Sequence, residues 1–240
     1  MTQVLKLWPL LTATHRYDKF LSTRNTGHGT IIEAPILAYL IETRQGRVLF
    51  DVGCDYHKLS TPAALAQWYG PDDFLMGPPQ MEEDQRLPAH FARLGLTPED
   101  IDLVFLSHLH FDHAGGLYEL CGAEVHAHED EFHAARKPAD NAYFAPDFDD
   151  NYRWRLQQDD YDLVSGLRAI NTPGHTAGHV SPMIELPDGA PVILAGDAAD
   201  LNENIAAEIA HGFCRRGRGD LATNSIRKLK KVAVETSAEL

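Results

Sequence analysis

The feature that most constrains this chain is the hexapeptide HLHFDH at residues 108–113, which contains the potential metal ligands His108, His110, Asp112 and His113. The apolar block DLVFLS comes directly before it and is too short to be a helix, so we predict a buried strand that ends at these residues. The following Ala-Gly-Gly allows a tight backbone turn. Imidazole and carboxylate groups suit zinc, and also iron or manganese. We therefore expect a metal site here rather than a polar loop whose histidines only form hydrogen bonds.

Two more polar residues follow apolar runs further along the chain. His175 lies in NTPGHTAGH, just after the run LRAI, and Asp197 lies in AGDA, just after PVIL. An aspartate at the end of a strand often only caps the next helix. Because the cluster upstream already offers several ligands, we expect both residues to complete its coordination set.

The composition excludes several classes of protein. The formal net charge of −14 argues against binding to nucleic-acid phosphates or to anionic membranes. No run of about 18 apolar residues is present, so we expect no membrane span. Cys54, Cys121 and Cys214 are far apart and form no CxxC pair, so neither a disulfide framework nor a thiolate zinc site is expected. The apolar N-terminal stretch has no signal-peptide cleavage site and is predicted to be a core strand, so the expected location is cytoplasmic.

Apolar periodicity predicts strands that alternate with helices. Hairpins are predicted at residues 35–52 and 181–198, single strands at 124–127 and 167–171, and helices at 61–69, 87–95, 129–136 and 224–235. Residues 138–162 are rich in aromatic and acidic side chains with little periodicity, so we predict a long loop that acts as a lid or binding element. This order of elements favours mixed sheets with helices outside.

The motifs HLHFDHAGG, TPGHTAGH and GDA, in this order and at these separations, resemble the metal motifs of the metallo-β-lactamase superfamily. The first strands, the segment HFARLGL and the tail helix NSIRKLKKVA are similar, more narrowly, to the N-acyl homoserine lactonase and pyridoxolactonase branch. The resemblance covers nearly the whole chain. It implies one α+β domain over residues 1–240, folded as a four-layer αβ/βα sandwich, with two mixed sheets face to face, helices outside, and metals at one edge between the sheets.

The resemblance also implies a set of metal ligands and a reaction. It assigns His108, His110 and His175 to a first zinc ion, Asp112 and His113 to a second, and Asp197 to both. A hydroxide that bridges the two ions would attack the carbonyl of an N-acyl homoserine lactone or another small lactone, and Asp112 would pass a proton to the leaving alkoxide. The expected partner is a small-molecule ester or lactone, and a homodimer is left open.

Apolar and aromatic side chains are available to hold such a substrate. Phe111 lies within the metal motif, and Phe144, Phe148, Tyr152 and Trp154 lie in the long loop. Each of them could equally pack the loop against the domain. We therefore expect only that the loop as a whole borders the site.

Asp200 marks one departure from the lactonase branch. It stands three residues after Asp197, where the lactonases have a tyrosine that helps to hold the substrate carbonyl. An ionised carboxylate accepts hydrogen bonds but donates none. We therefore favour a helix cap at LNENI for Asp200 and keep a substrate contact by this residue as the alternative. Polarisation of the carbonyl would then fall more heavily on the metal, or another donor such as Tyr143 or Tyr152 would serve.

The tail of the sequence marks a second departure. No GHD-like or SHD-like segment follows the tail helix, so the branch's last strand and its terminal histidine ligand are expected to be missing and the second zinc site to be weakened. His211 is the only histidine after Asp197, but its surroundings, HGFCRR, match no ligand motif, and we do not expect it to substitute. Two alternatives to the lactonase therefore stay open, namely a thioester hydrolase of the glyoxalase II type and a catalytically impaired member.

Overall fold

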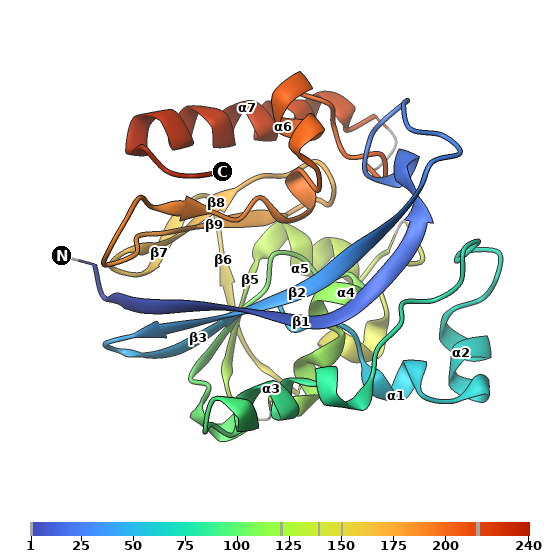
Figure 1. Cartoon of the computed structure of the whole chain (residues 1–240), viewed down its shortest axis with the longest axis horizontal. Coiled ribbons are helices and arrows are strands. Elements are labelled where there is room, and N and C mark those ends of the chain that lie inside the picture. The colour runs from blue at the N-terminus through green and yellow to red at the C-terminus, as the bar shows by residue number, and fades with distance from the viewer. Residues whose placement is uncertain (1, 121, 139, 150, 215–216) are drawn as a thin grey trace.

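The computed structural model describes residues 2–120, 122–138, 140–149, 151–214 and 217–240. Figure 1 shows two β-sheets stacked between helices that lie on their outer sides. Within these ranges, no helix combines the length and the apolar character needed to cross a bilayer. The layers confirm the predicted αβ/βα sandwich.

The first sheet contains six strands in the order β1-β2-β3-β4-β5-β6. Their bounds are Val4–Asp18 for β1, Ile31–Thr43 for β2, Gly46–Phe50 for β3, Leu103–Phe105 for β4, Glu124–His128 for β5 and Arg153–Gln157 for β6. The strands β1 to β3 pair antiparallel, whereas β3 to β6 pair in parallel. The central strand β4 is apolar throughout because parallel strands between two layers bury both faces.

The second sheet contains four strands in the order β10-β9-β8-β7, and their pairs are antiparallel. Their bounds are Tyr161–Val164 for β7, Leu167–Asn171 for β8, Val180–Ile184 for β9 and Val192–Ile193 for β10. Beside β10, Ile193 N–H donates to the carbonyl oxygen of Glu239 at 2.7 Å. The last residues of the chain therefore run along the edge of this sheet.

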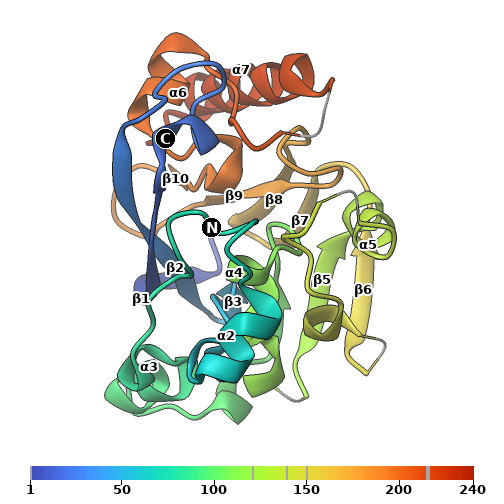
Figure 2. The same cartoon turned by 90° about the vertical axis from the view of Figure 1, so that its right-hand side faces the viewer.

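Seven α-helices are described. Their bounds are Tyr56–Leu59 for α1, Pro62–Trp68 for α2, Leu87–Arg93 for α3, Phe111–Ala114 for α4, Glu129–Ala135 for α5, Asn202–Ala207 for α6 and Gly219–Thr236 for α7. In Figure 2, α6 and α7 lie above β8 and β9, while α2 and α3 lie at the opposite end of the molecule. The tail helix α7 begins earlier than predicted and buries Ile226 and Leu229 on one face.

Three apolar cores separate the four layers. Between the sheets, Phe50 and Phe105 of the first sheet pack with Leu167 and Val180 of the second. On the outer side of the first sheet, the helices α3 and α5 contribute Phe91 and Phe132. On the outer side of the second sheet, Leu229 of α7 packs on Ile170. Each sheet is thus fixed from both faces, and the loops at its edge start from rigid positions.

The predicted hairpins and the helices near residues 61–69, 87–95 and 129–136 are confirmed by the structure. The prediction of one long loop at 138–162 was wrong, because β6 lies within it and pairs with β5 through Val125 opposite Trp154. This short edge strand exposes Arg153, Arg155 and Leu156 and only half-buries Trp154 and Gln157, so its apolar signal is weak.

Candidate metal centre

The candidate ligands meet at one edge between the two sheets. The segment 107–116 leaves β4 of the first sheet, whereas the turns that hold His175 and Asp197 follow β8 and β10 of the second. Where these segments leave the sheets, Val180 N–H donates to the carbonyl oxygen of Ser107 at 2.9 Å. Residues far apart in the sequence are therefore brought to one place by strands that end side by side.

Three imidazoles from these segments point at one another. His175 Nε2 lies 3.2 Å from His108 Nε2 and 3.0 Å from His110 Nδ1. All three side chains are buried. Burial is the main cause that lowers the pKa of each, to about 3 for His110, so these rings are neutral at neutral pH.

The outer nitrogens of these rings show which atom carries the proton. His108 Nδ1 lies 2.9 Å from Ser107 Oγ, whose own proton is donated to Asp51 Oδ2. His108 therefore donates from Nδ1 and keeps a lone pair on Nε2. His110 Nε2 has no hydrogen-bond partner among the described residues and lies 3.6 Å from Asp140 Oδ1. Inner lone pairs that face one another at such distances repel unless a cation lies between them, so this donor set fits a metal ion.

Asp197 links these rings to a second group of ligands. Its Oδ2 lies 3.2 Å from His175 Nε2, and its Oδ1 lies 3.3 Å from His113 Nε2. Asp112 Oδ2 lies 3.8 Å from the same nitrogen of His113. One carboxylate thus has an oxygen beside each group, which is the arrangement that a bridging ligand needs.

The second group carries the charges of the site. Burial alone would raise the pKa of Asp197, but His113 and His175 hold it well below its usual range. Burial alone would lower the pKa of His113, but Asp197, Asp112 and Asp51 hold it well above its usual range. Burial, helped by the charge of Asp197, raises the pKa of Asp112 to about 6. Asp112 can therefore exchange a proton near neutral pH.

Asp51 is a functional residue that the sequence motifs did not indicate. Its carboxylate lies on the side of His108 and His113 that faces away from the other ligands. Its carboxylate accepts from Ser107 N at 2.7 Å, from Ser107 Oγ at 2.8 Å and from His113 Nδ1 at 2.8 Å. Partners of this kind orient metal-binding imidazoles and fix their tautomers. A polar residue at the end of the buried strand β3, in FDVG, was the sequence signal that could have found it.

Glu131 of α5 is a second missed residue. Its fully buried carboxylate accepts from Leu109 N at 3.1 Å, from Gly178 N at 3.0 Å and from Tyr143 Oη at 2.9 Å. One side chain therefore holds the loop of the HLHFDH motif and the loop after His175 together. Among the helical residues near the N-terminus of α5, the sequence offered no signal that separated Glu131 from its acidic neighbours Glu129 and Asp130.

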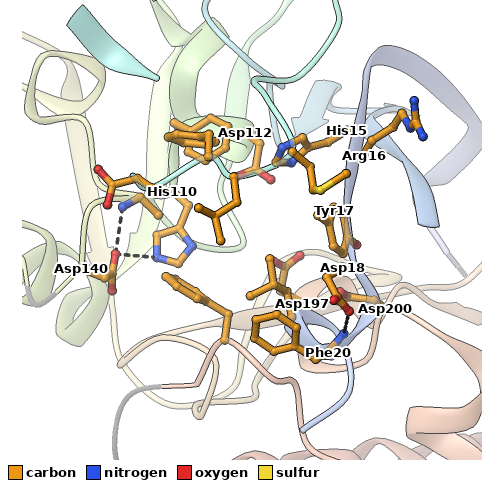
Figure 3. A pocket seen from close by; sticks show the side chains of 18 of the residues that line it. His15, Arg16, Tyr17, Asp18, Phe20, His110, Asp112, Asp140, Asp197 and Asp200 are labelled. Atoms are coloured by element: carbon orange, nitrogen blue, oxygen red, sulfur yellow. Dashed lines mark hydrogen bonds and ion pairs between the residues drawn. The ribbon is translucent and has the colours of Figure 1, made fainter. Parts of the chain in front are cut away.

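A cavity of about 500 Å³ opens over the candidate ligands. Figure 3 shows His110, Asp112 and Asp197 around its centre, with Tyr17 and Asp200 farther along the wall. Its lining also includes four large apolar side chains that are exposed at the surface, namely Ile31, Leu75, Met76 and Phe213. The cavity therefore combines a polar floor with an apolar rim.

Of the aromatic residues proposed for the substrate, only Phe111 lines this cavity. Phe144 stacks behind Phe111, with ring centroids 5.2 Å apart. Phe148, Tyr152 and Trp154 pack in or against the core beneath the first sheet instead. The long segment does reach the cavity, but through residues 140–142 rather than through these rings.

Asp200 does not cap a helix, so that interpretation was wrong. The residue before α6 is Leu201, whose backbone N–H bonds to the side chain of Asn204. Asp200 lines the cavity instead, and its Oδ2 accepts from His211 Nε2 at 2.9 Å. Asp200 is thus bonded to His211, whose surroundings match no ligand motif.

His211 lies at the candidate site although its sequence context gave no such indication. Its Nδ1 lies 3.1 Å from Nδ1 of His175, and its ring is buried. His175, Asp197 and His211 place one potential ligand atom each within 4.8 Å of one another. The only available signal was that His211 is the sole histidine downstream of Asp197.

Comparison with known proteins agrees with this geometry. Residues 32–236 match the model of the metallo-beta-lactamase superfamily. An N-acyl homoserine lactonase from a Bacillus species is 32% identical over 208 residues, which cover 86% of this chain and 80% of the relative. The N-acyl homoserine lactonase AttM of Agrobacterium fabrum is 31% identical over 219 residues, which cover 87% of this chain and 82% of the relative.

A solved structure gives the same result for the fold. It is an N-acyl homoserine lactone hydrolase with the product N-hexanoyl-L-homoserine bound at its catalytic metal centre. It superimposes with a TM-score of 0.85 at 27% identity, covering 100% of this chain and 92% of the other. The motifs, the layers and the matched residues lead to one conclusion: this chain belongs to the metallo-beta-lactamase superfamily.

Proposed function

We propose that this metal-dependent hydrolase opens the ring of N-acyl homoserine lactones with two zinc ions. His108, His110 and His175 would hold the first ion, Asp112 and His113 the second, and Asp197 both. The observation that carries the proposal is the position of Asp197, whose two oxygens lie 3.2 Å from His175 Nε2 and 3.3 Å from His113 Nε2. The relatives named above support the substrate class.

In the proposed ester hydrolysis, the bound zinc and Asp112 would have different roles. Zinc in this site would lower the pKa of a water molecule from about 15.7 toward about 7 and polarise the carbonyl group. Asp112, whose carboxylate lies beside His113 and Asp197, would accept a proton and return it to the leaving alkoxide. The sequence contains no GxSxG motif, so a serine-esterase mechanism has no support, and the proposed attack by a metal-activated water requires no side-chain nucleophile.

The cavity supports a substrate with one polar end and one apolar end. A lactone ring would lie over the polar floor beside Phe111, and an acyl chain would extend along the apolar rim toward Leu75 and Met76. Exposed apolar side chains that gather around a cleft are typical of ligand-binding grooves. Of the two tyrosines expected to donate to the substrate, Tyr143 packs its ring 4.5 Å from that of His110, but its hydroxyl donates to Glu131 and does not face the cavity.

The test is hydrolysis of a substrate panel by zinc-loaded and chelator-treated protein. The panel contains N-acyl homoserine lactones of several chain lengths, other small lactones and acyl-thioesters, with zinc content measured on the same samples. We expect about two zinc ions per chain, turnover of the lactones, and loss of that turnover after chelation. Turnover of thioesters alone would favour the glyoxalase II alternative, and zinc-free, inactive protein would favour the impaired one.

A further inference from the structure

His211 lies between a carboxylate and a candidate metal ligand. Its Nε2 donates to Asp200 Oδ2 at 2.9 Å, and the same oxygen accepts from Ser22 Oγ at 2.6 Å. Its Nδ1 lies 3.1 Å from the backbone nitrogen of Phe213, whose N–H is shared with the carbonyl oxygen of Leu21. An N–H aimed at Nδ1 requires a lone pair on that atom. In its neutral form, His211 is therefore the tautomer protonated on Nε2.

This tautomer decides the protonation of His175. The Nδ1 atoms of His175 and His211 are 3.1 Å apart, so only one of them can carry a proton. Since Nδ1 of His211 is an acceptor, the proton belongs to Nδ1 of His175. A neutral His175 then has its lone pair on Nε2, the atom that faces His108 and His110 at 3.2 Å and 3.0 Å. The opposite tautomer would direct a proton into the metal position.

The backbone holds His211 firmly in this place. On either side of it, Ala210 O accepts from Arg24 N at 2.9 Å, and Phe213 N donates to Leu21 O at 2.8 Å. His211 and His175 are 5% and 4% exposed, so water has little access to replace either partner. The pair is therefore a built contact between the segment after α6 and the candidate zinc site.

We propose that Asp200 and His211 are positioning residues, which hold His175 in the tautomer and orientation that a zinc ligand needs. The inference rests on the proposed zinc site and adds two residues to it that touch no metal. Partners behind a metal-binding imidazole typically change metal affinity by about 10-fold to 100-fold when they are removed. Asp200, which stands where the lactonase resemblance expects a tyrosine, would thus act through His211 and not on the substrate.

The test compares two substitutions of His211 by zinc competition against a chromophoric chelator. His211→Phe removes the acceptor for His175 Nδ1 and fills a similar volume, so zinc affinity should fall by about 10-fold to 100-fold. His211→Asn offers a side-chain oxygen near the former Nδ1 and should recover most of that loss. Equal affinities of wild type and His211→Phe, or equal losses in both variants, would overturn the proposal.

A spectroscopic signal separates positioning from a general loss of packing. In ¹H–¹⁵N spectra of the zinc-loaded protein, the Nδ1–H of His175 should be protected from exchange in the wild type and in His211→Asn, and unprotected in His211→Phe. A protected signal in all three proteins counts against the proposal.

Two further variants complete the experiment: a substitution of Asp200, which is less buried than His211, and a matched control at His126. Asp200→Leu removes the carboxylate without altering either ring and should also weaken zinc binding, whereas an unchanged affinity would contradict the inference. His126→Phe breaks another imidazole–carboxylate contact of 2.9 Å, to Glu124, and should leave zinc affinity unchanged. If the wild type bound no zinc, the proposed function would fall together with this inference; if wild type and variants bound zinc alike, only the inference would fall.

Discussion

Asp51 shows how one residue can serve backbone, side chain and metal site at once. Its backbone has φ of +55°, in the left-handed region, where asparagine and aspartate are tolerated best after glycine. Its carboxylate is 2% exposed and receives donors from Ser107 and His113. The left-handed backbone at Asp51 therefore directs its carboxylate toward Ser107, just after the neighbouring strand β4.

Asp51→Asn should weaken zinc binding while the fold is kept. Asparagine accepts the positive φ, but its amide group would face one of the present donors instead of accepting from it. We expect zinc affinity to fall by about 10-fold to 100-fold, measured by competition with a chelator. Asp102→Asn is the control, because Asp102 accepts from a backbone N–H of Arg47 far from the site. An unaltered affinity in Asp51→Asn would show that His113 needs no such partner.

At the scale of elements, the metal-binding loop lies very close to the segment that follows β3. A Cβ on Gly116 would lie 2.2 Å from the carbonyl oxygen of Val52, which belongs to backbone and cannot move aside cheaply. Gly116 N–H also donates to Gly53 O at 3.1 Å. The double glycine after the ligands is therefore a packing requirement, and the turn that the sequence predicted is only part of its role.

Gly116→Ala should lower the free energy of unfolding by roughly 1–3 kcal/mol, as overpacking of a close contact does. Urea denaturation followed by circular dichroism measures it. Gly70→Ala is the matched control, because a Cβ there meets no atom within 4 Å. A loss in Gly116→Ala no larger than in Gly70→Ala would mean that the loop relaxes freely.

The helix α5 joins two loops through one carboxylate. Glu131→Gln keeps the shape, but its amide nitrogen must face a donor at Leu109, Gly178 or Tyr143. We expect a loss of about 1–3 kcal/mol in stability, the cost of a buried donor left unpaired. Asp130→Asn on the same helix replaces an exposed carboxylate and should change stability by less than about 0.5 kcal/mol. Similar free energies of unfolding for both variants would show that the hydrogen bonds of Glu131 do not stabilise the two loops.

At the scale of the whole molecule, the buried imidazoles make the metal-free protein sensitive to acid. The pKa is lowered for His15, His108, His110, His128, His175 and His179, in each case mainly by burial, and raised for His113 and His211. A histidine with a lowered pKa binds its proton more readily in the unfolded chain. Its contribution to stability is therefore complete above pH 6.5 and is lost as the pH falls toward the folded pKa.

For His110 and His179, the folded pKa of about 3 sets this window between pH 6.5 and about pH 3. At pH 5 each would cost about 2 kcal/mol. We expect the urea midpoint of chelator-treated protein to fall between pH 7.5 and pH 5. His179→Asn should reduce that fall, since Asn can keep the contact with Thr172 without titrating. A midpoint independent of pH in this range would contradict the burial of neutral rings.

The parts of the fold that could be predicted are those with local signals. Hairpins, helices and the ligand motifs all follow from periodicity or spacing within short segments. The segment 138–162 failed because β6 exists through its pairing with β5, which leaves little trace in its own residues. His211 and Glu131 could not be assigned for a related reason: their roles depend on contacts with residues 36 and 47 positions away along the chain.

The apolar rim of the cavity has a practical consequence. Ile31, Leu75, Met76 and Phe213 line the opening, yet each is at least 39% exposed, so they contribute little to the cores. Exchanges at such surface positions usually alter stability by no more than about 0.5 kcal/mol. Libraries randomised at these four positions could therefore alter the substrate preference of the proposed lactone hydrolysis while the imidazoles and carboxylates beneath keep their places. The cavity rim is therefore a suitable region for laboratory evolution of substrate selectivity.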